Sequence, residues 1–132
     1  MARVLVIDDD AALRTLISVS LRKAGHVITE AGDGVEALRL CRQQQFDLAI
    51  CDIFMPKKEG LETIPLMRQA IPELKIVVVS GGSHLLPMTF LPLAQMLGAN
   101  RVLAKPFTVA QLVATVEDVL TPSQEAQAPS SA

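Results

Sequence analysis

The sequence lacks the features that mark several broad classes of protein. It carries 12 Lys and Arg against 14 Asp and Glu, and its basic residues are scattered rather than clustered. It therefore offers no concentrated basic field for nucleic acid. No apolar run approaches the roughly 20 residues that cross a bilayer, and the start "MARVLVIDDD" lacks the parts of a signal peptide. We expect a cytoplasmic protein with no direct nucleic-acid partner and no membrane partner.

Cysteine is scarce as well. Only Cys41 and Cys51 are present, and they do not form a CxxC spacing. Two separated cysteines give no ligand set for a structural zinc site. Because each lies inside a helical or strand-like pattern, we expect both to be buried, reduced thiols.

The chain does contain a regular alternation of apolar runs and helical periodicity, and half of its 132 residues are apolar. Strands are predicted at 3–8, 26–31, 47–52, 75–80 and 101–106. Helices are predicted at 11–24, 34–44, 60–71, 88–97 and 108–120. Several strands are continuous runs of Val and Ile, which is typical of strands buried on both faces. This pattern predicts one α/β domain with a parallel sheet and helices on both faces.

The helix ends and apolar faces of this pattern can be predicted in more detail. Gly25 closes the first helix and Thr108 is a natural N-cap for the last. Pro65 and Pro92 predict that the third and fourth helices are kinked or begin late. The first helix has an apolar stripe made of Leu13, Leu16, Ile17, Val19, Leu21 and Ala24, and the last repeats Leu112, Val113, Val116 and Leu120 at helical spacing. The remainder, 121–132, is predicted to be a disordered tail or the start of a linker.

Charged and polar residues follow the predicted strands where each one ends. In chain order they are Asp8 and Asp9, Asp52, Ser80 and Lys105. The carboxyl ends of parallel strands meet at one edge of a sheet, where sites gather in such folds. Three carboxylates about 5 Å apart repel by roughly 3 kcal/mol per pair at an effective dielectric near 20. A hard cation such as Mg²⁺ relieves this repulsion, so we expect a magnesium site there.

The same edge has the groups for phosphoryl chemistry. Lys105 supplies a positive charge, and Ser80 with Gly81 offers a hydroxyl and backbone N–H groups to phosphate oxygens. An aspartate can accept a phosphoryl group as an acyl phosphate, and Asp52 ends the central apolar strand. Each signal is ordinary alone, since three acids also make a solvated helix start and Ser-Gly-Gly also makes a turn. Their order along one five-unit pattern is the specific observation.

The motifs "VLVIDDDAALR", "DLAICDIFMPKKEGLE", "IVVVSGG" and "GANRVLAKPF" resemble the receiver domain of two-component response regulators over roughly residues 2–120. They stand in the family's order and at nearly its spacing. The resemblance implies a flavodoxin-like, doubly wound sheet of five parallel strands in the order 2-1-3-4-5, with five helices. It assigns 1–120 to the receiver domain.

The resemblance also implies a role for each site residue. Asp52 would be the phosphoacceptor, becoming a 4-aspartylphosphate, and Asp9 and Asp52 would ligate Mg²⁺ directly. The backbone carbonyl of Phe54 would be a further ligand, and Asp8 would act through a bound water. The phosphoryl donor would be a sensor histidine kinase, a histidine phosphotransferase or a small acyl phosphate.

The remaining implied roles concern the phosphoryl group itself. Lys105 would pair with Asp52 and then with the phosphoryl group, and its bond to Pro106 is expected to be cis. Ser80 and the adjacent Gly81 would contact the phosphoryl oxygens. Such a domain catalyses its own phosphorylation and dephosphorylation, but it is mainly a signalling switch.

Three features depart from the family pattern. Val102 stands where most members carry Tyr or Phe, so the usual aromatic switch is missing and dimerisation on that face is open. Phe54 is bulky for a position that governs water access, which predicts altered and slower autodephosphorylation. The segment "GGSHLLPMTFLPLAQML" is longer and more apolar than usual, and either covers the sheet edge or docks a partner. His26 and His84 are expected to be structural and solvated, respectively.

The sequence leaves three functional classes open. The first is a stand-alone receiver, or one cut from a longer regulator, that signals by altered binding to an unknown downstream protein. The second is a receiver that docks without phosphorylation. The third is a haloacid-dehalogenase-type phosphatase, since Asp8 and Asp10 form a D-x-D, although Ala12 stands where that motif has Thr or Val.

Overall fold

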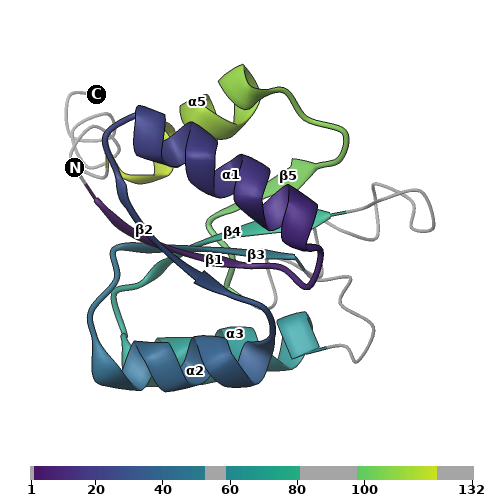
Figure 1. The fold of residues 1–132 in the computed structure, drawn as a ribbon. Helices are drawn as coiled ribbons and strands as arrows, with labels where there is room; N and C mark the ends of the chain where they lie inside the picture. The colour runs from purple at the N-terminus through teal and green to yellow at the C-terminus, as the bar shows by residue number, and fades with distance from the viewer. Residues whose placement is uncertain (1, 53–58, 81–97, 122–132) are drawn as a thin grey trace, which may run out of the picture.

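The computed structural model describes residues 2–52, 59–80 and 98–121. A single sheet of five parallel strands, in the order β2-β1-β3-β4-β5, has helices on both faces (Figure 1). The elements in chain order are β1 (Arg3–Ile7), α1 (Ala11–Lys23), β2 (Val27–Ala31), α2 (Gly34–Gln43), β3 (Leu48–Asp52), α3 (Glu59–Ala70), β4 (Lys75–Ser80), β5 (Arg101–Ala104) and α5 (Val109–Val119). The predicted fold and strand order are confirmed. The helix expected at 88–97 lies outside the described residues.

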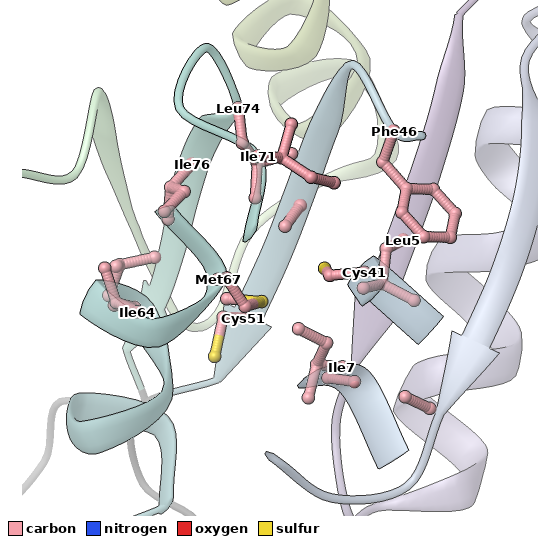
Figure 2. Packing of buried hydrophobic residues seen from close by; sticks show 14 residues of the cluster. Leu5, Ile7, Cys41, Phe46, Cys51, Ile64, Met67, Ile71, Leu74 and Ile76 are labelled. Atoms are coloured by element: carbon pink, nitrogen blue, oxygen red, sulfur yellow. The ribbon is translucent and has the colours of Figure 1, made fainter. Parts of the chain in front are cut away.

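The strands are apolar on both faces because the sheet lies between two helical layers. Helices α2 and α3 cover one face, and α1 and α5 cover the other (Figure 1). The buried cluster under α2 and α3 is drawn in Figure 2 and includes Leu5, Ile7, Ile64, Met67 and Ile76. The opposite cluster joins strand residues such as Val6 and Ile50 to Ile17, Leu21, Leu112 and Val116 of α1 and α5. Every residue of the central strand β3 is buried.

Local chemistry fixes where the helices begin. Asp10 caps α1, and its side chain accepts hydrogen bonds from the backbone N–H groups of Ala12 and Leu13. Asp33 caps α2 in the same manner. Thr108 caps α5 as predicted, in a capping box with Gln111. These caps satisfy N–H groups that have no partner inside the helix, and α1, α2 and α5 each start within a residue of the predicted position.

One detail of the predicted helices is wrong, and one of two predicted alternatives is excluded. Leu16 and Val19 of α1 are 49% and 42% exposed, so the stripe that packs on the protein is narrower than the apolar pattern suggested. Helix α3 begins at Glu59 and contains Pro65, so of the two predicted alternatives, a kink or a late start, the late start does not occur. A helix needs only part of an apolar face to pack, and sequence periodicity does not show which part.

The predictions for cysteine and for His26 are confirmed. Both thiols are free and buried, and burial raises the pKa of Cys41 to about 11 and that of Cys51 to about 12. His26 is buried, and its Nδ1 accepts a hydrogen bond from the backbone N–H of Ala2. Within the part of the chain that the structure describes, no helix is long and apolar enough to cross a membrane.

Candidate functional site

Strand register brings the predicted site residues to one edge of the sheet. Asp52, the last residue of β3, pairs with Val79, and Ser80, the last residue of β4, pairs with Ala104. Lys105 is the next residue after Ala104. On the other side of β3, Ile7 pairs with Cys51, which places Asp8 next to Asp52. Four strands therefore bring predicted site residues to the carboxyl edge: two residues follow β1, and β3, β4 and β5 bring one each.

The carboxylates of Asp8, Asp9 and Asp52 form a compact cluster. One oxygen from each residue lies within 4.8 Å of those of the other two. Asp8 is 1% exposed and Asp52 is 4% exposed, whereas Asp9 faces solvent. Oxygen-rich, partly buried clusters of this size suit a hard divalent cation that also keeps water ligands.

The surroundings of Asp8 test whether these residues fit such a cation. One carboxylate oxygen, Oδ1, accepts the backbone N–H of Asp10 at 2.8 Å. The other, Oδ2, is buried and has no hydrogen-bond partner among the described residues. Burial, followed by the negative charges of Asp52 and Asp9, raises the pKa of Asp8 to about 6 against the opposing effects of the Asp10 N–H and Lys105. A buried carboxylate oxygen beside two other carboxylates fits a bound cation.

Lys105 provides the positive charge at this cluster. Its Nζ donates to Oδ2 of Asp52 at 3.0 Å, and its side chain is 27% exposed against 5% for the aspartate. The bond from Lys105 to Pro106 is cis, as predicted. The structure thus joins the predicted nucleophile and the predicted phosphate-binding cation directly.

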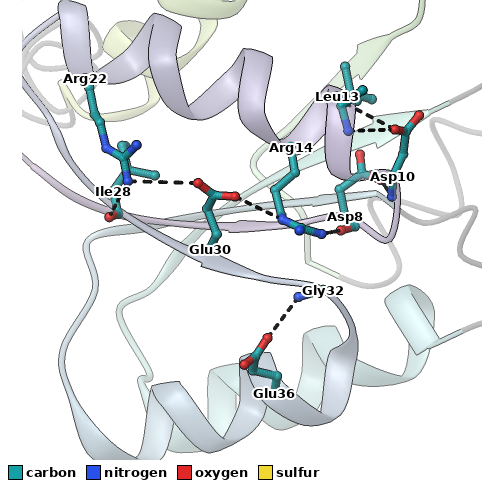
Figure 3. A network of polar contacts seen from close by, with 10 residues as sticks. Asp8, Asp10, Leu13, Arg14, Arg22, Ile28, Glu30, Gly32 and Glu36 are labelled. Carbon is teal, nitrogen blue, oxygen red and sulfur yellow. Dashed lines mark hydrogen bonds and ion pairs between the residues drawn. The ribbon is translucent and has the colours of Figure 1, made fainter.

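The loop that carries Asp8, Asp9 and Asp10 is stabilised by hydrogen bonds and ion pairs that sequence analysis missed (Figure 3). Arg14 on α1 donates from Nη1 to the backbone carbonyl of Asp8 at 2.7 Å, and from Nε to Oε1 of Glu30 at 3.0 Å. Arg22 also approaches Glu30, at 3.9 Å. Nothing in the local pattern marked Arg14, because its ionic partner lies 16 residues away on β2.

Several predicted positions lie outside the described residues. Phe54, Gly81 and His84 belong to the segments 53–58 and 81–97, and only the backbone position of Ser80 at the end of β4 is described. Val102 is half-buried in β5, paired with Val78. Asp10 caps α1 and is not part of the carboxylate cluster.

Known proteins are similar to this chain in sequence and in fold. Residues 4–117 match the family described as response regulator receiver domain. The probable chemotaxis protein CheY of Rhizobium etli is 36% identical over 122 residues, which cover 89% of this chain and 91% of that protein. A crystal structure of a response regulator from Burkholderia pseudomallei, with a phosphorylated aspartic acid, calcium ion and citrate, is 27% identical with a TM-score of 0.79. That match covers 98% of this chain and 73% of the other.

Some relatives are much longer. The DNA-binding transcriptional regulator NtrC of Azospirillum brasilense is 37% identical over 119 residues, which are 90% of this chain but only 24% of that protein. The likeness therefore covers one domain of such regulators and nothing of their other parts. The matched family, the sheet order and the acidic edge agree, and the chain belongs to the receiver domains of two-component response regulators.

Proposed function

We propose that the domain is a switch that is phosphorylated on Asp52 with Mg²⁺. The observation that carries this proposal is the contact of Lys105 Nζ with Asp52 Oδ2 at 3.0 Å, beside the carboxylates of Asp8 and Asp9. A nucleophilic carboxylate, a cation partner for the phosphoryl group and an oxygen-rich metal cluster meet at one point. Phosphoryl transfer depends mainly on such positioning and charge neutralisation.

The transfer begins when a carboxylate oxygen of Asp52 attacks the phosphorus of a phosphohistidine or of a small acyl phosphate. The bond from phosphorus to the donor nitrogen or oxygen breaks, and its electron pair leaves with the donor. The product is an acyl phosphate on Asp52, and hydrolysis of its phosphorus–oxygen bond restores the carboxylate and releases phosphate. Lys105 pairs with the carboxylate before transfer and with the phosphoryl oxygens afterwards.

The metal set of the proposal consists of Asp9, Asp52, the Phe54 carbonyl and, through water, Asp8. Bound Mg²⁺ would neutralise negative charge on these carboxylates and on the incoming phosphoryl oxygens. Ser80 and Gly81 would donate hydrogen bonds to the phosphoryl group. The cluster within 4.8 Å and the buried, unpaired Oδ2 of Asp8 among the described residues support the metal part of this assignment.

The signalling part of the proposal concerns partners. The donor would be a sensor histidine kinase or a histidine phosphotransferase in the cytoplasm, and the output a changed affinity for an unidentified downstream protein or a second copy of the chain. The receiver would occupy 1–120 and leave 121–132 as a tail or linker; helix α5 ends at Val119, near this boundary. Because Val102 lacks an aromatic ring, repacking of an aliphatic side chain would replace the usual ring movement.

The experiment is direct phosphorylation of the full chain with Mg²⁺ and acetyl phosphate. We expect one added phosphoryl group by intact mass, stable in acid and labile in alkali, mapped to Asp52 and lost in Asp52→Asn. Chelation of Mg²⁺ should abolish the label in the parent. The variant Asp33→Asn is the matched control, because Asp33 is an exposed helix cap outside the cluster and should be labelled as the parent is.

The other outcomes identify the competing classes. A label on Asp8 would support an aspartate-nucleophile phosphatase. A folded parent that takes no label from acetyl phosphate or from a phosphohistidine donor would support a receiver that only docks. Either result overturns the assignment of Asp52.

A further inference from the structure

The loop that carries Asp8, Asp9 and Asp10 is held from one side by a single arginine. Arg14 Nη1 donates to the backbone carbonyl of Asp8 at 2.7 Å, while its Nε donates to Glu30 on β2 at 3.0 Å (Figure 3). The guanidinium is thus fixed by Glu30 of β2 and donates a hydrogen bond to Asp8, the first residue of the acidic loop. Its side chain is 22% exposed, so most of it is enclosed.

The backbone and side chain of Asp8 are hydrogen-bonded at several points, and Arg14 binds the carbonyl. The Asp8 N–H donates to the carbonyl of Ala31 at 3.1 Å, and Oδ1 accepts the Asp10 N–H at 2.8 Å. These bonds fix the amide and one carboxylate oxygen of Asp8. The bond from Arg14 fixes the peptide that joins Asp8 to Asp9. The orientation of this peptide sets the positions of the two carboxylates relative to each other.

The contact acts through position rather than through net charge. Glu30 offsets the positive charge of Arg14, and the charges that shift the pKa of Asp8 come from Asp52, Lys105 and Asp9. Gly32 lies beside this arrangement, since a Cβ at that position would be in ordinary van der Waals contact with Arg14 Nη1, at 3.6 Å. The guanidinium is therefore packed against the turn after β2 as well as bonded on both sides.

We propose that Arg14, held by Glu30, is a positioning residue that sets the affinity of the Asp8–Asp9–Asp52 cluster for Mg²⁺. Three carboxylates within 4.8 Å repel one another in the metal-free protein. Without Arg14 the peptide after Asp8 is free to turn and separate the carboxylates, and Mg²⁺ binding must then restore the geometry. Removing a group that does not touch the metal but orients its ligands typically weakens metal affinity by about 10- to 100-fold.

This inference rests on the proposed Mg²⁺-dependent phosphorylation, and Mg²⁺ affinity tests it separately from phosphorylation. The chain has no Trp and no Tyr, so calorimetric titration of the full chain with Mg²⁺ replaces fluorescence. We expect Arg14→Met to weaken Mg²⁺ binding about tenfold. Arg14→Lys should fall between Arg14→Met and the parent, because one ammonium group cannot reproduce the fork of two bonds.

A matched control is Arg39→Met. Arg39 also pairs with a glutamate and a glutamine, Glu36 and Gln43, but it is 56% exposed and its partners are on α2. We expect its Mg²⁺ affinity to stay within about twofold of the parent. A tenfold loss in Arg39→Met as well would overturn a specific role for Arg14.

The initial rate of labelling by acetyl phosphate supplies a second readout. Arg14→Met should need about ten times more Mg²⁺ than the parent for half-maximal rate, and Arg14→Lys should need an intermediate excess. Both variants should reach the parental rate at saturating Mg²⁺. A merely structural role would lower thermal stability equally with and without Mg²⁺, whereas a positioning role also shrinks the Mg²⁺-induced rise in Tm.

Two results would overturn the inference. One is an Mg²⁺ affinity within twofold of the parent in both Arg14 variants. If Arg14→Met loses its helical circular dichroism and is therefore unfolded, the affinity of Arg14→Lys alone decides. The other is a lower rate at saturating Mg²⁺ with unchanged affinity. A parent that binds Mg²⁺ but takes no label would refute the proposed function and leave this inference standing.

Discussion

The polar groups at the amino and carboxyl ends of the strands differ in how they are hydrogen-bonded. At the amino edge, Asp47 accepts the backbone N–H of Arg3 at 2.8 Å, and His26 accepts that of Ala2 at 3.2 Å. At the carboxyl edge, three carboxylates crowd within 4.8 Å, and Asp8 Oδ2 has no hydrogen-bond partner among the residues that the structure describes. The polar groups named at the amino edge are paired within the chain, whereas a buried carboxylate oxygen at the carboxyl edge has no partner among the described residues.

This difference separates stability from function. Hydrogen bonds that fix strand ends hold the sheet together, and removing one partner leaves a polar group unpaired. Buried like charges work in the opposite direction, because they destabilise the folded chain until a cation or phosphoryl group arrives. Substitutions at the amino edge should therefore alter stability alone, and substitutions at the carboxyl edge should alter activity more than stability.

The largest expected effect is at Lys105, compared with Lys75 at the amino end of β4. Lys105→Met removes the cation that contacts Asp52 at 3.0 Å and should slow labelling by acetyl phosphate about a hundredfold. Lys75→Met removes a lysine at the opposite edge and should leave the rate within about twofold. The measurement is the initial rate at saturating Mg²⁺. Equal losses in the two variants would remove the distinction between the edges.

The second effect concerns the pH dependence of stability. The pKa of Asp8 is raised from 3.8 to about 6, chiefly by burial. The folded chain then holds a proton that the unfolded chain has lost between pH 4 and 6, so its stability falls as the pH rises through that window. The loss is roughly 2 to 3 kcal/mol and is complete about one pH unit above the folded-state pKa.

Thermal unfolding with a chelator, from pH 4 to pH 7, measures this loss. We expect the parent Tm to fall on the order of 10 °C across the window. Asp8→Asn has no carboxyl group to titrate there and should lose most of that fall, as should the parent in saturating Mg²⁺. An equally steep fall in Asp8→Asn would show that Asp8 is not the group responsible.

The edges also differ in how far the sequence predicted them. The strands and the site order were readable because Val and Ile runs end in single functional residues, such as Asp52 and Lys105. Caps such as Thr108 were readable because their chemistry is local. Contacts between distant segments were not, which is why Arg14 with Glu30 and the exposure of Leu16 were missed. Periodicity predicts a face, whereas three-dimensional packing selects its partners.

Asn100 at the amino edge shows the same limit. Its Oδ1 accepts hydrogen bonds from the backbone N–H of Ile76 at 2.8 Å and from Arg68 Nη2 at 2.9 Å. The backbone N–H of Asn100 donates to the carbonyl of Ile76 at 2.7 Å. Arg68 also donates to the carbonyl of Leu74 at 2.8 Å. One side chain therefore joins the end of α3 to the starts of β4 and β5, in a place where the sequence shows only a loop residue before a strand.

The smallest of the three effects is the loss of this junction. Asn100→Ala removes the shared acceptor and should lower the free energy of unfolding by about 1 to 2 kcal/mol in denaturant titration. Labelling of Asp52 should keep the parental rate, because every changed contact lies at the edge opposite Lys105. Asn100→Asp retains an acceptor for Ile76 and Arg68 and should recover most of the stability. If Asn100→Ala instead slowed phosphorylation while keeping full stability, the amino edge would be coupled to the chemistry and the two edges would not be independent.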